Sequence, residues 1–158
     1  MIHLLPHSAK RIISEKTPED IYIILKSVTD SRKAVLSTNA EFVGLVQPFD
    51  FRIVPKINYR NSFLPVLIGN ITEKEEGTVI DITFHMPVFM QIFLIIWYGM
   101  ACFLFLCGIL AVFTGGAEQT AFILVPSGFI VLGQVLSRCC FYGPEKKSFN
   151  RLKELLCQ

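Results

Sequence analysis

The chain has 158 residues, of which 52% are hydrophobic and 18% are charged, and its formal net charge is +2. Residues 86–137 hold a single charge, Glu118, whereas the other 106 residues hold 27 of the 28 charges. This division excludes a single soluble domain and a disordered chain. The near-neutral balance and the few cysteines also exclude a nucleic-acid binder that works by charge alone and a disulfide scaffold.

A helix is predicted near the N-terminus from its start signals. The run Thr17-Pro18-Glu19-Asp20 combines a capping hydroxyl, a proline at the first helical position and acids at the positive end of the helix dipole. The apolar residues that follow have the i, i+3, i+4, i+7 spacing of a helix on a core: Ile21, Ile24, Leu25 and Val28. We expect the helix to end at residues 30–33 and a short strand over residues 11–14 to precede it.

Four segments of strand character follow, over residues 41–47, 51–57, 63–71 and 78–86. Alternation of apolar and polar residues is clearest in the second and fourth segments, so we expect one face of the sheet to be exposed to solvent. The connections are short enough for successive antiparallel pairing, with Pro55 and Pro65 at edges or bulges. The predicted fold class for residues 1–86 is therefore α+β, a small antiparallel sheet with one helix on its apolar face.

A two-helix transmembrane hairpin is predicted over residues 87–137. Its spans are residues 88–113 and 120–137, separated by the small and polar run Thr114 to Gln119. At about 1.5 Å per residue the first run is long enough to cross a hydrocarbon core of about 30 Å, and the second is near the lower limit. A buried hairpin inside a soluble protein is the alternative, but the rest of the chain is too small to cover two helices that are apolar on every face.

The distribution of basic residues predicts the orientation of the hairpin. The loop between the spans has no Lys or Arg, whereas the tail after Ser137, residues 138–158, has five: Arg138, Lys146, Lys147, Arg151 and Lys153. Because basic flanks resist translocation, we expect a multi-pass membrane protein with both termini in the cytoplasm. The apolar stretch at the N-terminus is too short for a signal-peptide core.

The basic tail has the pattern of a short amphipathic helix. Apolar residues alternate in it with polar and basic ones. One interpretation places it on an anionic inner leaflet through five membrane-surface residues: Lys146, Lys147, Phe149, Arg151 and Leu152. The other interpretation, of nearly equal weight, is docking of the tail on the sheet domain.

One polar cluster in the sheet domain is a candidate binding site, Tyr59-Arg60-Asn61-Ser62. Four different hydrogen-bonding side chains at one strand end, with Arg60 as a planar fork, suit a phosphate, a lipid headgroup or a carboxylate of a partner. The alternative is purely structural, since Asn-Ser is good turn chemistry and Tyr and Arg at strand ends often pack and snorkel.

Catalytic and metal-binding patterns are absent from the sequence. His3 and His7 are four residues apart, but Pro6 between them opposes a helix that would place both on one face. His85 reads as a polar residue at the membrane interface. No GxSxG, HExxH, CxxC or phosphate-binding glycine loop occurs. We therefore predict a protein without enzymatic activity, bound metal or cofactor.

Small residues four apart occur in both spans, Cys107 with Ala111 and Gly133 with Ser137. Such spacing lets helices approach closely, either within one hairpin or between copies of the chain in a homo-oligomer. No acid or base lies within either span, so a selective ion pathway has no support.

Several runs of the sheet domain resemble a family of small bacterial two-pass membrane proteins. The resemblance covers roughly residues 40–113, and its most specific part is the Tyr-Arg-Asn-Ser-Phe-x-Pro run over residues 59–65; weaker matches are Phe42-Val43-Gly44-Leu45-Val46 and Gly77-Thr78-Val79-Ile80. The resemblance implies a location in the bacterial inner (plasma) membrane and indicates no particular activity.

The leading hypothesis for function is a non-enzymatic two-pass membrane protein whose cytoplasmic domain is a binding or regulatory module at the inner leaflet. Its expected partners are the lipid bilayer and a protein or lipid headgroup, and not nucleic acid. The alternative is an oligomeric membrane effector or pore-forming protein gated by the cytoplasmic domain. An enzyme acting on lipid is the third hypothesis and requires His85, Tyr59 and Asp81 to converge.

Overall fold

The structure is a computed structural model that describes residues 6–30, 40–75, 77–115 and 121–157. It forms two compact units. The first unit combines the chain up to Pro87 with the segment from Cys140 onward, and the second is Val88–Cys139. The C-terminal tail thus belongs to the same unit as the sheet. His3 and most of the predicted loop between the spans lie outside the described residues.

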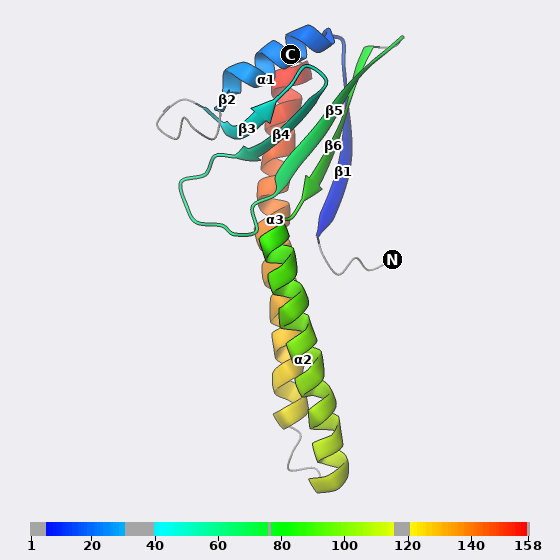
Figure 1. The fold of residues 1–158 in the computed structure, drawn as a ribbon, viewed down its shortest axis with the longest axis vertical. Coiled ribbons are helices and arrows are strands. Elements are labelled where there is room, and N and C mark those ends of the chain that lie inside the picture. The colour runs from blue at the N-terminus through cyan, green and yellow to red at the C-terminus, as the bar shows by residue number, and fades with distance from the viewer. Residues whose placement is uncertain (1–5, 31–39, 76, 116–120, 158) are drawn as a thin grey trace. The chain divides into compact units, whose positions relative to one another are not determined.

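The first unit contains a six-stranded sheet with the strand order β1-β6-β5-β4-β3-β2 (Figure 1). Its elements are β1 (His7–Ser14), α1 (Pro18–Val28), β2 (Thr29–Asp30), β3 (Phe42–Val46), β4 (Asp50–Pro55), β5 (Val66–Lys74) and β6 (Gly77–His85). Four pairings are antiparallel, and the short β2 runs parallel to β3. The α+β class is confirmed, but the sheet is mixed and not purely antiparallel.

Helix α1 forms for the reasons that its sequence indicates. Thr17 caps it, because the Oγ1 of Thr17 accepts a hydrogen bond of 3.2 Å from the main-chain N–H of Asp20. Ile21 and Leu25 are fully buried in the core. The helix ends at Val28, earlier than expected, because Thr29 is already extended and joins the sheet as part of β2.

Strand boundaries differ from the predicted ones at three places. β1 begins at His7 instead of residue 11 and pairs with β6 over its whole length, from His7↔His85 to Ser14↔Thr78. β4 ends at Pro55, and β5 begins at Val66, directly after Pro65. Both prolines thus stand at strand ends, where a missing ladder donor costs little.

One face of the sheet forms the core. Its strand residues alternate between this inner face and a solvent-facing side, and the fully buried ones include Phe51, Ile53, Leu67, Ile80, Ile82 and Phe84. The ring of Phe51 lies over Gly69 and fills the space that a Cβ atom on residue 69 would need. On the opposite face, Arg52 is exposed, as the alternation predicts.

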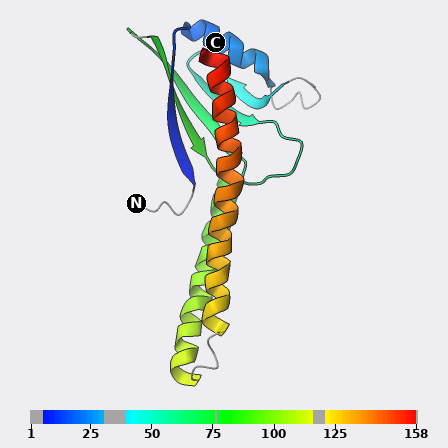
Figure 2. The ribbon, with the colours of Figure 1, turned by 180° about the vertical axis from the view of Figure 1, so that it is seen from behind.

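Helix α3 (Ala121–Cys157) is continuous, and its last part, residues 140–157, lies on the inner face of the sheet (Figure 2). Phe141, Leu152 and Leu156 are fully buried there. The rings of Phe149 and Phe84 are in edge contact, with centroids 6.5 Å apart. The structure therefore favours docking of the tail on the sheet over a position of Leu152 on the lipid surface. The tail is also not a separate helix, as predicted, but the continuation of the second apolar helix.

The second unit is a helical hairpin of α2 (Val88–Gly115) and the first part of α3. Both helices are long and apolar enough to cross a membrane. Only 22% of the most apolar window of α2, and 17% of that of α3, is buried inside the protein. The buried residues of α2 are Met90, Leu94, Tyr98, Ala101 and Gly108. Many large apolar side chains of both helices are exposed, among them Phe89, Phe103 and Leu132.

The two helices of the hairpin approach closely at two glycines. Gly108 lies against the main-chain carbonyl of Phe122, which has no helical donor because Pro126 lacks an N–H. Gly133 is buried beside the side chains of Trp97 and Tyr98. The predicted close approach at Gly133 therefore occurs between the two helices of one chain.

A candidate binding cleft in the sheet domain

A cleft of about 360 Å³ opens in the first unit between the turn after β4 and the last part of α3. Its size lies within the range of about 300–1,000 Å³ typical of small-molecule sites. The described residues that line it are Ala40, Glu41, Phe42, Pro55, Lys56, Ile57, Asn58, Tyr59, Pro144, Lys147, Ser148 and Arg151. The cleft thus combines apolar walls with polar and mainly basic groups.

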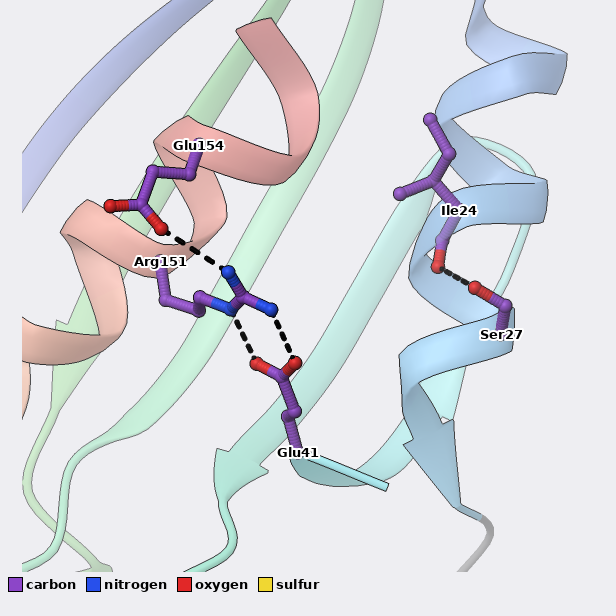
Figure 3. A network of polar contacts seen from close by, with 5 residues as sticks. All are labelled: Ile24, Ser27, Glu41, Arg151 and Glu154. Atoms are coloured by element: carbon purple, nitrogen blue, oxygen red, sulfur yellow. Dashed lines mark hydrogen bonds and ion pairs between the residues drawn. The ribbon is translucent and has the colours of Figure 1, made fainter. Parts of the chain in front are cut away.

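An ion pair stands at one side of this cleft (Figure 3). The Nε and Nη2 atoms of Arg151 each donate a hydrogen bond of 2.7 Å to the carboxylate of Glu41. The Nη1 atom of Arg151 donates to Glu154 at 3.2 Å. The hydrogen bonds from Arg151 lower the pKa of Glu41, and they raise the pKa of Arg151 itself. Both groups therefore stay charged at neutral pH.

The backbone around Glu41 and the helix around Arg151 fix the two partners. The N–H of Glu41 donates to the carbonyl of Val28 at 3.0 Å, and its carbonyl accepts from the N–H of Lys56 at 2.8 Å. On α3, Ser148 and Leu152 flank Arg151 along the helix and are buried. The ion pair thus joins the start of β3 to the helix that covers the sheet.

The structure separates the four residues of the predicted Tyr59–Ser62 cluster. Tyr59 lines the cleft and is 62% exposed. Asn61 is engaged within the protein, because its Nδ2 donates to the carbonyl of Cys140 and its Oδ1 accepts from the N–H of Phe63, each at 3.0 Å. Arg60 and Ser62 are exposed and are not among the residues that line the cleft. Asn61 therefore has a structural role.

The predicted membrane-surface residues of the tail also have different surroundings. Lys147 and Arg151 line the cleft. Lys146 is exposed and does not line it, Phe149 packs on Phe84, and Leu152 is fully buried. Sequence reasoning missed Glu41 and Lys56 as site residues, because nothing local connects Glu41 with a partner 110 residues away.

A buried ion pair fastens α3 to β1 within the same unit. The carboxylate of Glu145, with only 5% of its side chain exposed, accepts from Lys10 Nζ at 2.7 Å and from Ser8 Oγ at 3.0 Å. Lys10 Nζ also lies 4.6 Å from the centre of the Phe149 ring. These groups satisfy one another, so they hold the helix on the sheet and leave no open site.

The three residues that a lipid-directed enzyme would need have different surroundings. The ring of His85 is in edge contact with the ring of His7, with centroids 5.1 Å apart, and burial together with His7 lowers the pKa of His85. Asp81 is held by Arg11, at 2.6 Å and 3.1 Å. Tyr59 lines the cleft. Among the described residues, no group of three or more His, Cys, Asp or Glu is placed to hold a metal ion.

A second hollow, of about 460 Å³, lies beside the β5–β6 hairpin. Its described lining residues are Ile13, Lys74, Glu75 and Val79. One cation and one acid give it no net charge, so it favours no charged ligand. The cleft beside Arg151 is the better candidate site.

Comparison of the chain with protein-family models, with curated proteins and with solved structures finds no match.

Proposed function

We propose that this is a non-enzymatic, two-pass protein of the bacterial inner membrane whose cytoplasmic sheet domain binds a small ligand or a partner in the cleft. The observation that carries the proposal is the cleft itself, which combines apolar walls with several convergent polar and basic groups. The protein then acts as a binding or regulatory module at the inner leaflet.

The exposed apolar surface of the hairpin supports the membrane part of this proposal. Large side chains such as Phe89, Phe103 and Phe113 are 75%, 66% and 83% exposed. Soluble proteins rarely leave a continuous apolar surface of this kind in water, whereas lipid covers it without cost. The basic residues after Ser137 support cytoplasmic termini.

The way in which α3 is used favours a binding module over an oligomeric effector. Two pairs of small residues supported the effector hypothesis in the sequence. Gly133 and Ser137 are buried within the chain's own hairpin, whereas Cys107 is exposed and Ala111 is half-buried. The last part of the same helix supplies one wall of the cleft through Pro144, Lys147 and Arg151. A ligand in the cleft would therefore contact both the sheet domain and α3.

Native mass spectrometry of the protein released from mild detergent tests the proposal. We expect the wild-type chain to retain a small molecule or partner. Asn58→Trp, which places a large ring at an exposed residue of the cleft lining, should lower that retention. Asn70→Trp is the matched control, because Asn70 is an exposed residue of β5 and does not line the cleft.

Three outcomes are informative. Retention that only Asn58→Trp reduces supports a binding module with this cleft as its site. Retention that neither substitution changes removes the cleft from the proposal. A discrete homo-oligomer that carries nothing else would instead favour the effector hypothesis.

A further inference from the structure

We infer that the cleft takes a phosphate-bearing anion, and that this anion competes with Glu41 for the guanidinium group of Arg151. The inference rests on the proposed function, because it names the class of ligand that the same cleft binds. Its basis is the charge, the hydrogen-bonding geometry and the apolar walls of the cleft.

Charge is the first observation. Three cations line the cleft, Lys56, Lys147 and Arg151, against one acid among its described lining residues, Glu41. Glu154, outside the lining, also contacts Arg151, so that the cations still outnumber these two acids. Glu41 is already bound by Arg151. The lining therefore carries an excess of positive charge inside a concave surface, where the field of the cations is focused and the local concentration of anions rises.

Geometry is the second observation. A guanidinium group presents a planar pair of donors that fits a carboxylate or a phosphate equally well. In this structure the pair is Nε and Nη2 of Arg151, and both donate to the carboxylate of Glu41 at 2.7 Å. The internal carboxylate of Glu41 thus occupies a position that a phosphate fits, and the hydroxyl of Tyr59 and the amide of Asn58 add donors on the same cleft.

The walls of the cleft point to an organic phosphate and not to a bare ion. Phe42, Pro55, Ile57 and Pro144 supply apolar surface next to the cations. A volume of about 360 Å³ exceeds what inorganic phosphate alone would fill, and it suits a phosphate ester with a small organic part. A soluble ester and the headgroup of an anionic lipid share this chemistry.

Calorimetric titration of the full chain tests the inference. The protein is placed in nanodiscs of phosphatidylcholine, and glycerol 3-phosphate is the soluble probe. We expect saturable binding that Lys147→Ala weakens about tenfold, since one charge-assisted hydrogen bond is lost. Lys147 is exposed, and its removal leaves the Glu41–Arg151 pair in place, so this variant should fold normally.

Glu41→Gln gives the decisive second variant. It removes the competing carboxylate and frees the Nε and Nη2 donors of Arg151, while Nη1 keeps its contact with Glu154. We therefore expect glycerol 3-phosphate to bind several times more tightly. Lys153→Ala is the matched control, because Lys153 is an exposed lysine of the same helix that does not line the cleft. Its affinity should equal that of the wild type.

Native mass spectrometry from nanodiscs that contain phosphatidylglycerol identifies the source of the phosphate. Binding of glycerol 3-phosphate supports a soluble ester. Retention of phosphatidylglycerol that Lys147→Ala abolishes, without binding of the soluble probe, supports a lipid headgroup. The inference is overturned if neither probe responds to Lys147→Ala, or if Glu41→Gln weakens binding. Retention of a molecule without phosphate that Asn58→Trp reduces would also overturn it, while the proposed function would stand.

Discussion

The side-chain amide of Asn61 donates a hydrogen bond of 3.0 Å to the main-chain carbonyl of Cys140. Pro144, four residues further along α3, lacks the N–H that this carbonyl would accept from in an unbroken helix. The loop between β4 and β5 therefore supplies the donor that proline removes. This exchange helps to explain how α3 continues through Gly143 and Pro144 onto the sheet.

Removal of the Asn61 donor should loosen α3 at this point. We expect Asn61→Ala and Asn61→Asp each to destabilise the segment by about 1 kcal/mol, the usual net contribution of one hydrogen bond. The aspartate keeps an acceptor for the N–H of Phe63 but cannot donate to Cys140, so it separates the two roles of Asn61. Hydrogen exchange of peptides that cover residues 140–147 is the measurement. Wild-type protection in the aspartate variant would show that the carbonyl does not need this donor.

Local patterns in the sequence were sufficient for the main elements of the fold. The capping run at Thr17, the alternation in β4 and β6, and the long apolar runs each follow from forces between near neighbours in the chain. The start of β1 depended on a distant contact. This strand begins at His7 because β6 offers a partner strand, whereas residues 7–10 have no strand pattern of their own.

The candidate site shows the same division. Tyr59, Lys147 and Arg151 could be chosen from the sequence because Tyr and basic residues stand out in a short polar segment. Glu41 could not be chosen, since only the folded chain brings it to Arg151. The structural role of Asn61 could not be predicted either, because its side chain supplies the donor that Pro144, 83 positions further along the sequence, lacks.

The buried Glu145 should make the domain sensitive to the loss of Lys10. Lys10→Met leaves a carboxylate of which only 5% is exposed without its cation, and we expect a loss of about 3 kcal/mol in the free energy of unfolding. The double variant Lys10→Met/Glu145→Leu should recover most of this loss, because an apolar pair has no charge to bury. Thermal unfolding in detergent provides the comparison. A double variant as unstable as the single one would contradict a purely electrostatic origin.

Acidification should weaken the pairing of β1 with β6 through His85. Burial first, and His7 second, lower the pKa of His85, so the folded state takes up a proton less readily than the unfolded state. Stability is then unaffected at pH values well above the ordinary histidine pKa of about 6.5, and it falls as the pH drops below that value. Hydrogen exchange of β1 amides between about pH 7.5 and 5.5 measures the effect.

The histidine prediction has matched controls. His85→Gln should remove most of the pH dependence, and His7→Gln only part of it, because His7 is the smaller of the two causes. Each variant is compared with the wild type at the same pH, so that the intrinsic rate of exchange cancels. Equal pH profiles in the wild type and in His85→Gln would exclude His85 as the sensor.

The hairpin should tolerate an added methyl group at one glycine and not at another. A Cβ on Gly108 would collide with the main-chain carbonyl of Phe122, whereas one on Gly128 meets nothing within 4 Å. Gly108→Ala should therefore force α2 and α3 apart and destabilise the hairpin by about 1–3 kcal/mol, the usual cost of overpacking. Gly128→Ala should be neutral or slightly stabilising, because alanine favours the helix. Thermal unfolding of both variants in the same detergent decides the matter, and an equal response of the two glycines would mean that the backbones are not in contact at Gly108.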